Sequence, residues 1–230
     1  MVNIDFSLLF PEFALVYNRN MLRNSSTKRV IPYFPSQELV STWKKKEYPK
    51  IFVICGPSGS GKEVVLNGAL KRIKKLRRVK TLMTRPILRR EDKAGREKVS
   101  VRGFFNLDRQ GRLIEKNFYA GHWYGTPTDG VEEVIEEGNN AILDIDINGM
   151  KALKKRYSNV VSIFLKTNFE DLKKRIESRG GFSPSEIGRR LSIAKAEIAK
   201  SKICDYNVWN RQDHLNQAID RVVKIIKGKK

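Results

Sequence analysis

The chain has 230 residues, of which 46 are Lys or Arg, 25 are Asp or Glu and 40% are hydrophobic, so its formal net charge is +21. This composition excludes a disordered chain, a collagen and a disulfide-stapled scaffold, and it fits one ordinary folded domain with an appendage. The apolar runs are broken at Pro11, Lys50 or Asp144, before they reach the ~20 residues that span a bilayer. Because the chain also has only two cysteines, Cys55 and Cys204, we expect a soluble cytoplasmic protein that does not use a membrane.

The basic residues are unevenly distributed along the chain. Residues 71–102 hold 14 Lys or Arg against 3 acids, residues 151–230 hold 20 against 8, and residues 103–150 hold 3 against 9. Basic segments around an acidic middle favour a phosphate-rich ligand. Two alternatives stay open: RNA could bind to the basic surface, or the basic residues could simply lie on solvent-exposed faces of helices and bind nothing.

Residues 1–49 contain four prolines and no sustained period, so we expect an irregular N-terminal extension. The folded domain is predicted to begin at Lys50 and to continue to residue 230. Its first element, KIFVIC, is a run of strand formers that ends at Gly56. The segment EVVLNGALKRIKKL then repeats apolar residues at helical spacing, which predicts a strand, a loop and a helix.

Strands and helices continue to alternate in the second half of the chain. NNAILDIDI and SNVVSIFLKT are predicted as buried strands, and the helices GMKALKKRY and NFEDLKKRIESR follow them. PSEIGRRLSIAKAEIAKSK predicts a long polar helix, and DHLNQAIDRVVKIIK predicts a terminal amphipathic one. Between about 80 and 130 the alternation stops at strand-like pieces such as VSVRGFF and FYAGHWYG, so we expect an inserted lobe. The pattern predicts an α/β fold with a central parallel sheet covered on both faces.

A phosphate-binding loop is predicted between the first strand and the first helix. Residues 56–62 read GPSGSGK, which matches G-x-x-x-x-G-K. Glycines let successive backbone N–H groups converge on a phosphate, the helix dipole attracts it, and Lys62 can reach the terminal phosphates. Because the match lies directly after a predicted strand and before a predicted helix, phosphate binding explains it better than a simple turn.

The residue after Lys62 departs from the motif. A Ser or Thr normally stands there and its hydroxyl binds Mg²⁺, whereas this chain has Glu63. A carboxylate can bind Mg²⁺ too, so Glu63 is one candidate metal ligand. The alternative is that Glu63 only stabilises the N-terminus of the helix.

Four later segments carry a resemblance to a known family. TLMTRPILRREDKAGREK is similar to S-x-T-T-R-x-P-R-x-G-E-x-x-G, and LIEKNFYAGHWYGT matches E-x8-Y-G-[ST] without gaps. ILDIDINGM is similar to I-L-D-I-D-x-Q-G, and RIESRG with GRRL resembles a mobile lid. In this order the motifs resemble the guanylate kinase family from about Lys50 to the end. The resemblance implies a P-loop NTPase fold with a GMP-binding lobe at about 80–130 and a helical lid at about 175–192.

The resemblance also implies roles for individual residues. The ATP-binding residues would be Gly56, Pro57, Ser58, Gly59, Ser60, Gly61, Lys62, Glu63 and, beside the base, Asn210. The GMP-binding residues would be Thr81, Arg85, Arg89, Asp92, Lys98, Glu115, Tyr124, Thr126, Asp144 and Asp146. The catalytic residues would be Lys62, Arg85, Arg179 and Arg190. Lys98 stands where the family has a tyrosine that binds the GMP phosphate, and it still offers a positive donor.

The chemistry of these residue types agrees with the resemblance. Guanine presents two adjacent donors, so the single carboxylate of Glu115 can accept from both, and Thr126 can serve the O6 edge. Thr81 and Tyr124 can hydrogen-bond the GMP phosphate, and Arg85 and Arg89 can bind it through paired N–H groups. Asp144 and Asp146 are two apart on a predicted strand and would point to the same side of the sheet.

The sequence therefore predicts a guanylate kinase that transfers a phosphoryl group from ATP to GMP in purine nucleotide metabolism, with Mg²⁺ bridging the ATP oxygens. The first alternative is an inactive relative that uses the nucleotide pocket or its basic surface for a partner, which Glu63 and Lys98 motivate. Nucleic acid binding stays a further alternative, and the oligomeric state is left open.

Overall fold

The computed structural model describes residues 48–87, 95–119, 121–178 and 183–229. The predicted N-terminal extension therefore lies outside the described residues except for Tyr48 and Pro49. Three predicted site residues, Arg89, Asp92 and Arg179, also lie outside them.

The central sheet is parallel throughout, as the alternation of strands and helices predicts. Its order is β2-β7-β1-β8-β9. The bounds are β1 Ile51–Cys55, β2 Leu76–Arg78, β7 Asn140–Asp144, β8 Val160–Lys166 and β9 Tyr206–Trp209. Strands β2 and β9 are the outer strands, and their three and four residues are too short to show a periodic pattern in the sequence.

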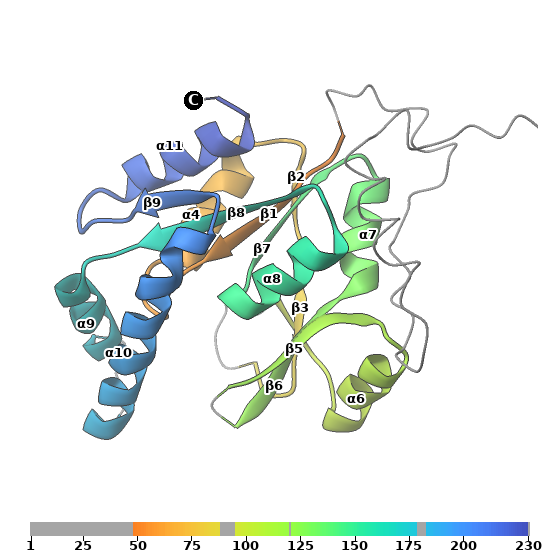
Figure 1. Cartoon of the computed structure of the whole chain (residues 1–230), viewed down its shortest axis with the longest axis horizontal. Coiled ribbons are helices and arrows are strands. Elements are labelled where there is room, and N and C mark those ends of the chain that lie inside the picture. The colour runs from red at the N-terminus through yellow and green to blue at the C-terminus, as the bar shows by residue number, and fades with distance from the viewer. Residues whose placement is uncertain (1–47, 88–94, 120, 179–182, 230) are drawn as a thin grey trace, which may run out of the picture.

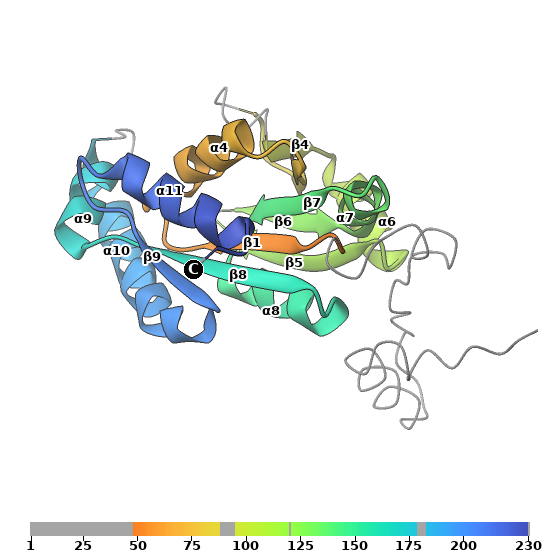
Figure 2. The ribbon, with the colours of Figure 1, turned by 90° about the horizontal axis from the view of Figure 1, so that it is seen from above.

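Helices cover both faces of this sheet. Alternate residues of β1 point to opposite faces, so Phe52 and Ile54 belong to one apolar cluster while Ile51 and Val53 belong to the other. The first cluster includes residues of α4 (Lys62–Arg72) and α11 (Leu215–Ile226), and the second includes residues of α7 (Thr128–Glu136) and α8 (Ile147–Arg156). Figure 1 shows α11 above the strands and α8 below them, and Figure 2 shows the same layers from above.

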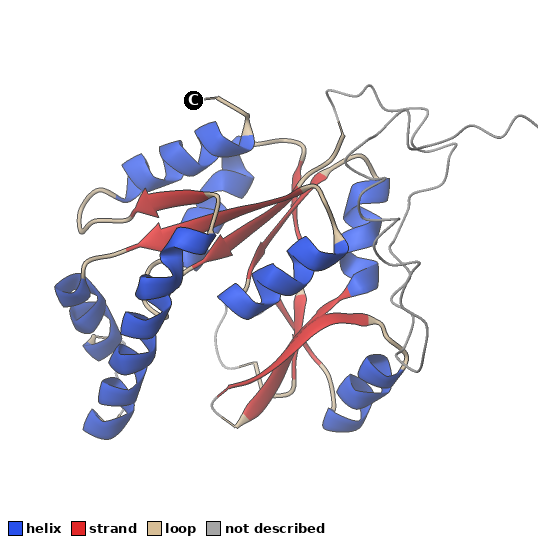
Figure 3. Cartoon of the chain, in the orientation of Figure 1, coloured by secondary structure: helices blue, strands red, loops and turns tan. Residues whose placement is uncertain are grey.

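The predicted inserted lobe contains a second sheet, which Figure 3 shows below the central one. Its order is β4-β3-β6-β5, with β4 parallel to β3 and the other neighbours antiparallel. The bounds are β3 Thr81–Met83, β4 Arg96–Lys98, β5 Leu113–Tyr119 and β6 His122–Pro127. The hairpin of β5 and β6 confirms the strand prediction for FYAGHWYG.

The strand-like prediction for VSVRGFF is wrong, because this segment forms helix α6 (Val101–Arg109). Ser100 begins the helix, since its hydroxyl accepts a hydrogen bond from the Gly103 N–H at 3.0 Å. Phe104 is fully buried and anchors one face of the helix to the lobe, with its ring near that of Trp123. A capping serine and one buried aromatic residue decide the conformation here against the local preference for a strand.

Two helices form a separate arm at the other side of the molecule, at the lower left of Figure 1. They are α9 (Phe169–Glu177) and α10 (Pro184–Ala199), and the 3-10 helix η2 (Lys200–Ile203) follows them. Leu172, Ile176 and Ala194 form the apolar contact between the pair. In the part of the chain that the structure describes, no helix is long and apolar enough to cross a membrane.

Candidate active site

The loop between β1 and α4 has the geometry of a phosphate-binding loop. Gly61 has a φ of 87°, a left-handed conformation that glycine adopts without strain. A Cβ at this position would lie 2.4 Å from the Asn210 side-chain nitrogen, so a larger residue would also be blocked sterically. The loop then enters α4, whose first turn supplies free backbone N–H groups.

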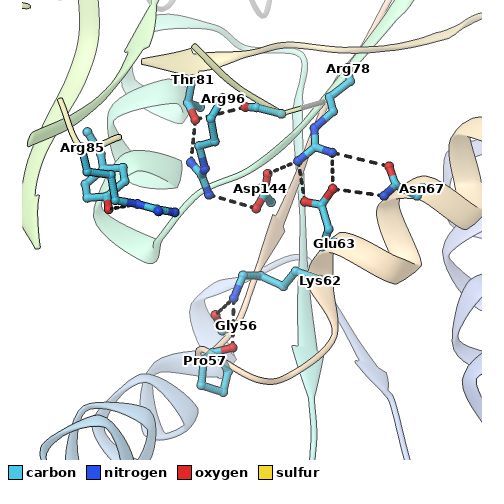
Figure 4. A network of polar contacts seen from close by, with 12 residues as sticks. Gly56, Pro57, Lys62, Glu63, Asn67, Arg78, Thr81, Arg85, Arg96 and Asp144 are labelled. Carbon is cyan, nitrogen blue, oxygen red and sulfur yellow. Dashed lines mark hydrogen bonds and ion pairs between the residues drawn. The ribbon is translucent and has the colours of Figure 1, made fainter. Parts of the chain in front are cut away.

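Lys62 folds back over this loop. Its ammonium donates hydrogen bonds to the carbonyls of Gly56 at 2.5 Å and Pro57 at 2.9 Å, as Figure 4 shows. Burial lowers the pKa of Lys62, while the charges of Asp144 and Glu197 oppose that shift. The side chain is thus a positive donor held at the loop, where a terminal phosphate would lie.

Asn210 also contacts the phosphate loop. Its side-chain amide donates a hydrogen bond to the Ser60 carbonyl at 2.8 Å, and its backbone N–H donates to the Lys166 carbonyl at 2.7 Å. The residue is buried. The structure therefore shows a contact between Asn210 and the loop, and its expected contact with the ATP base stays a prediction.

Glu63 lies in the first turn of α4 and forms a two-point contact with Arg78 at the end of β2. Figure 4 shows both contacts, and the distances from the two guanidinium nitrogens to the two carboxylate oxygens are 2.5 and 2.6 Å. Asn67, one turn along α4, also donates to Glu63 at 3.0 Å. Burial raises the pKa of Glu63, but the hydrogen bonds and charge of Arg78 outweigh it, so the net shift is downward. The carboxylate is ionised and neutralised by an arginine.

Asp144 connects this contact to the lobe. Its carboxylate accepts hydrogen bonds from Arg78 at 3.1 Å and from Arg96 of β4 at 3.2 Å. Both arginines are shielded from solvent, with side chains 7% and 23% exposed. A continuous chain of ionic contacts therefore runs from Glu63 through Arg78 and Asp144 to Arg96 (Figure 4).

Asp146 has a different role from Asp144. Strand β7 ends at Asp144, so the prediction that both acids lie on one strand is wrong. Asp146 is instead the N-cap of α8, where its carboxylate accepts a hydrogen bond from the Gly149 N–H at 2.7 Å. It also accepts from the Asn117 side chain at 2.5 Å, which links α8 to the lobe.

Hydroxyl and guanidinium groups of the lobe meet near Asp144. Arg96 donates a hydrogen bond to the Thr81 hydroxyl at 2.5 Å and lies over the ring of Tyr124, 5.8 Å from its centre. Arg85 donates to the Tyr124 hydroxyl at 3.0 Å. The structure thus brings together Thr81, Arg85 and Tyr124, which were predicted to bind the GMP phosphate.

The predicted guanine-binding pair is also assembled. Glu115 of β5 and Thr126 of β6 are paired across the hairpin, and the threonine hydroxyl donates to the carboxylate at 2.7 Å. Burial, helped by the nearby Asp146 charge, raises the pKa of Glu115 to about 7, against the lowering effect of Thr126 and Arg96. A carboxylate that titrates near neutrality is a frequent feature of functional sites.

The remaining predicted residues are less closely connected to this cluster. Lys98 ends β4 with an exposed side chain, and Arg190 lies half-buried on α10. Sequence reasoning missed Arg78, Arg96 and Asn117. One signal pointed to Arg78: an acid in place of the motif hydroxyl needs a positive partner when it is partly buried.

The comparisons with known proteins agree with this geometry. The family model for guanylate kinase matches residues 48–229. The chain belongs to the guanylate kinase family. It is 34% identical over 184 residues to the guanylate kinase of Thermotoga maritima, which covers 79% of this chain and 87% of that protein. It is also 34% identical over 185 residues to the guanylate kinase of Prochlorococcus marinus, which covers 80% of this chain and 100% of that protein.

A solved structure of the guanylate kinase family has the same fold. The crystal structure of guanylate kinase from Anaplasma phagocytophilum matches with a TM-score of 0.63 at 25% sequence identity. The match covers 79% of this chain and 86% of that chain. The expected P-loop kinase fold of the guanylate kinase family is therefore confirmed.

Proposed function

We propose that this protein transfers the γ-phosphoryl group of ATP to GMP. A GMP phosphate oxygen attacks the γ-phosphorus, the bond from that phosphorus to the bridging oxygen breaks, and ADP and GDP leave. The observation that carries the proposal is the chain of contacts joining two sites. Lys62 and its loop would bind ATP, the cluster around Thr81 and Glu115 would bind GMP, and Asp144 lies between them.

Guanine selectivity follows from the Glu115 and Thr126 pair. Guanine offers N1–H and an amino group side by side, so an ionised carboxylate can accept both, whereas adenine offers no such pair of donors. The Thr126 hydroxyl, which donates to Glu115 at 2.7 Å in the structure, can rotate and donate to guanine O6. A buried carboxylate left without its donors costs free energy, and this cost discriminates against other bases.

Catalysis in this proposal rests on position and charge. Lys62 holds the terminal phosphates of ATP, and Arg85 aligns the acceptor phosphate for in-line attack. In this proposal Arg190 of α10 and the predicted Arg179 would stabilise the charge of the transferred phosphoryl group, and the predicted Arg89 would bind the acceptor phosphate. No residue need form a covalent intermediate. Because water can attack the γ-phosphorus in place of GMP, closure of the α9 and α10 arm has to exclude water, or ATP would be hydrolysed.

The carboxylates of Glu63 and Asp144, beside the phosphate loop, both contact arginines. Both oxygens of Glu63 contact Arg78, and both oxygens of Asp144 contact arginines. Among the described residues there is also no group of three acidic, His or Cys side chains that could hold a metal ion. We propose that Glu63 is the counterion of Arg78, and that Mg²⁺ comes with ATP, bound by phosphate oxygens and water.

A coupled assay of ADP release tests the proposed function. The protein is given ATP and Mg²⁺ together with GMP, AMP, CMP or UMP. Of these four acceptors, we expect only GMP to be phosphorylated. Lys62→Ala should abolish this turnover. Glu115→Gln should impair the use of GMP far more than the binding of ATP, because an amide cannot accept both guanine donors.

The other outcomes of this assay are also informative. Equal loss of GMP use and ATP binding in Glu115→Gln would contradict the assignment of the guanine site. GMP binding without turnover would instead support a binding protein that has lost its kinase activity. RNA affinity that weakens with salt and survives Glu115→Gln would favour the basic surface as a nucleic-acid site. We propose a cytoplasmic location, which the two free, buried cysteines support.

A further inference from the structure

We propose that Arg96 is a GMP-binding residue whose guanidinium contacts the acceptor phosphate. This inference rests on the proposed function and adds a residue that the motifs of the sequence do not predict. In this chain Lys98 replaces the family's phosphate-binding tyrosine. A contact from Arg96 would supply a donor to the acceptor phosphate in its place.

The first argument is the position of Arg96 within the lobe. Its guanidinium lies between the Thr81 hydroxyl at 2.5 Å and the Asp144 carboxylate at 3.2 Å (Figure 4). It also lies over the face of the Tyr124 ring. Two residues predicted to hold the GMP phosphate, Thr81 and Tyr124, are therefore direct neighbours of Arg96. Any phosphate that reached these two hydroxyls would also reach the guanidinium.

The second argument is the remaining hydrogen-bonding capacity of this side chain. A guanidinium has five N–H donors, and within the described residues Arg96 uses two nitrogens, one toward Thr81 and one toward Asp144. The side chain is 23% exposed, so it is neither fully buried in the protein nor freely solvated. Planar N–H groups in such a position suit the oxygens of a phosphate.

The third argument is the balance of charge. Arg96 shares the Asp144 carboxylate with Arg78, so one acid lies between two guanidinium groups. A third guanidinium, that of Arg85, contacts the same Tyr124 from its hydroxyl. Like charges that converge in a partly buried site repel one another, and a doubly charged phosphate placed among them relieves that repulsion.

Arg78 and Asp144 then act as positioning residues for Arg96. The Arg78 guanidinium lies against the backbone of Gly95, where a Cβ would come within 1.9 Å of its nitrogen. Gly95 directly precedes Arg96, so this packing holds the start of β4 beside the ionic chain. The carboxylate of Asp144 then orients the guanidinium of Arg96 from the other side.

The competing explanation is that Arg96 only ties β4 to Thr81 and Asp144. The substitution Arg96→Gln distinguishes the structural tie from phosphate binding, because glutamine can still hydrogen-bond to Thr81 and Asp144 but carries no charge. If Arg96 is only a tie, Arg96→Gln keeps its affinity for GMP. If Arg96 contacts the phosphate, Arg96→Gln loses GMP affinity and keeps affinity for guanosine, which has no phosphate.

The experiment is a set of NMR titrations of the full chain with GMP, guanosine and AMP. We compare the wild type with Arg96→Gln, Arg96→Ala and Arg96→Lys, and use Arg102→Ala as a control that removes an exposed arginine from the nearby helix α6. We expect Arg96→Gln and Arg96→Ala to weaken GMP binding about 10- to 100-fold, the range for hydrogen bonds to charged groups. Guanosine binding should be unchanged, Arg96→Lys should recover part of the GMP affinity, and Arg102→Ala should behave as wild type.

The outcomes distinguish failure of this inference from failure of the proposed function. A wild type that does not prefer GMP to AMP would overturn the proposed function and the inference together. A wild type that prefers GMP, with an Arg96→Gln variant that binds GMP equally well, would overturn the inference alone. If Arg96→Ala does not fold, Arg96→Gln and Arg96→Lys still give the result, because both keep a polar side chain between Thr81 and Asp144.

Discussion

At the scale of single residues, the site depends on charges that neutralise one another across the phosphate loop. Glu63 would bring a negative charge close to the phosphates of ATP, and Arg78 removes that effect by contacting both carboxylate oxygens. The Arg78 side chain is 7% exposed, so it in turn needs the carboxylates of Glu63 and Asp144. The unusual acid and this arginine are best understood as one unit.

This interdependence predicts a loss of stability when one partner is removed. Glu63→Ser leaves the Arg78 guanidinium with Asp144 as its remaining ionic partner, and we expect it to lower the free energy of unfolding by about 1–3 kcal/mol. Urea denaturation measures the change. Asp129→Ser, which removes a partner of Arg112 from an exposed ion pair, is the matched control and should cost less than about 0.5 kcal/mol.

A double-mutant cycle with Arg78→Met checks that the effect belongs to the pair. If Glu63 and Arg78 act together, the cost of the double variant is smaller than the sum of the single costs. Additive single effects would contradict the coupling. Glu63→Ala tests Mg²⁺, because alanine offers no oxygen to a metal ion: if Glu63 were a metal ligand, Glu63→Ala would raise the Mg²⁺ concentration needed for ATP binding.

Glu115 predicts a pH dependence of guanine binding. Its pKa is raised to about 7, mainly by burial, and only the ionised carboxylate accepts both guanine donors. Affinity for guanosine should therefore fall about tenfold from about pH 8 to about pH 6. Guanosine is used because the phosphate of GMP titrates near pH 6 itself. Calorimetry at several pH values measures the profile, which should be flat in Glu115→Gln.

The sign for stability follows from the same shift. Because the folded-state pKa of Glu115 lies above its usual value, ionising this carboxyl destabilises the fold above about pH 7. That penalty decreases as the pH falls through about 7 toward the ordinary value of a glutamic acid.

A guanosine affinity that does not change between about pH 6 and pH 8 would contradict the assignment of Glu115.

At the scale of elements, short strands decide which side chains meet. The register of β5 and β6 pairs Glu115 with Thr126 and Asn117 with Tyr124, so one hairpin carries much of the predicted GMP site. Strand β2 has three residues, and its pairing beside β7 brings Arg78 to Asp144. Helix α4 carries Glu63 and packs on α11 through Gly68 and Ile219.

Two glycines within helices predict opposite effects when each is replaced by alanine. A Cβ at Gly68 would come within 2.6 Å of the Ile219 side chain, so Gly68→Ala should destabilise the protein by about 1–3 kcal/mol. Gly188 lies within α10 and a Cβ there meets nothing within 4 Å, so Gly188→Ala should stabilise by about 0.5–1 kcal/mol.

Thermal unfolding of the two variants measures both effects. The double variant with Ile219→Val, which removes one methylene group from the contact, should recover part of the stability that Gly68→Ala loses. A Gly68→Ala variant as stable as the wild type would show that α11 can shift away from α4 without cost.

At the scale of the whole molecule, the fold assembles the site from its two sheets and sets it in a strongly basic protein. The phosphate loop and Asp144 come from the carboxyl ends of β1 and β7, where ligands bind in open α/β sheets. The lobe contributes Glu115, Thr81 and Arg96 from the second sheet, and Arg85 from the segment after β3. Helices α9 and α10 lie across from the lobe, at the lower left of Figure 1.

The net charge of +21 predicts a strong effect of salt on catalysis. ATP and GMP are both anions, so the field of the protein should raise their encounter rate at low ionic strength. We expect kcat/KM for GMP to fall about 3- to 10-fold between about 20 and about 200 mM KCl, because salt screens that field. Steady-state kinetics measures it, with binding of uncharged guanosine as the control. An equal salt effect on guanosine would indicate a change in the protein instead of steering.

The sequence by itself determined the elements with strong local patterns. It predicted the parallel sheet, the phosphate loop and a strand-like FYAGHWYG, and it placed Glu115, Tyr124 and Thr126 in one motif, because periodicity, glycine spacing and motif order are properties of short segments. It did not predict helix α6, where the Ser100 cap and the buried Phe104 outweigh a run of strand formers.

Only the tertiary structure decided how the charges pair. Arg78 and Glu63 are 15 residues apart, Arg96 and Asp144 are 48 apart, and Arg78 and Asp144 are 66 apart. No local pattern connects such positions, since their distance depends on the pairing of β2 with β7 and of β3 with β4. In the sequence Arg78 and Arg96 are two among 46 basic residues, and the fold selects them by bringing both to the same carboxylate.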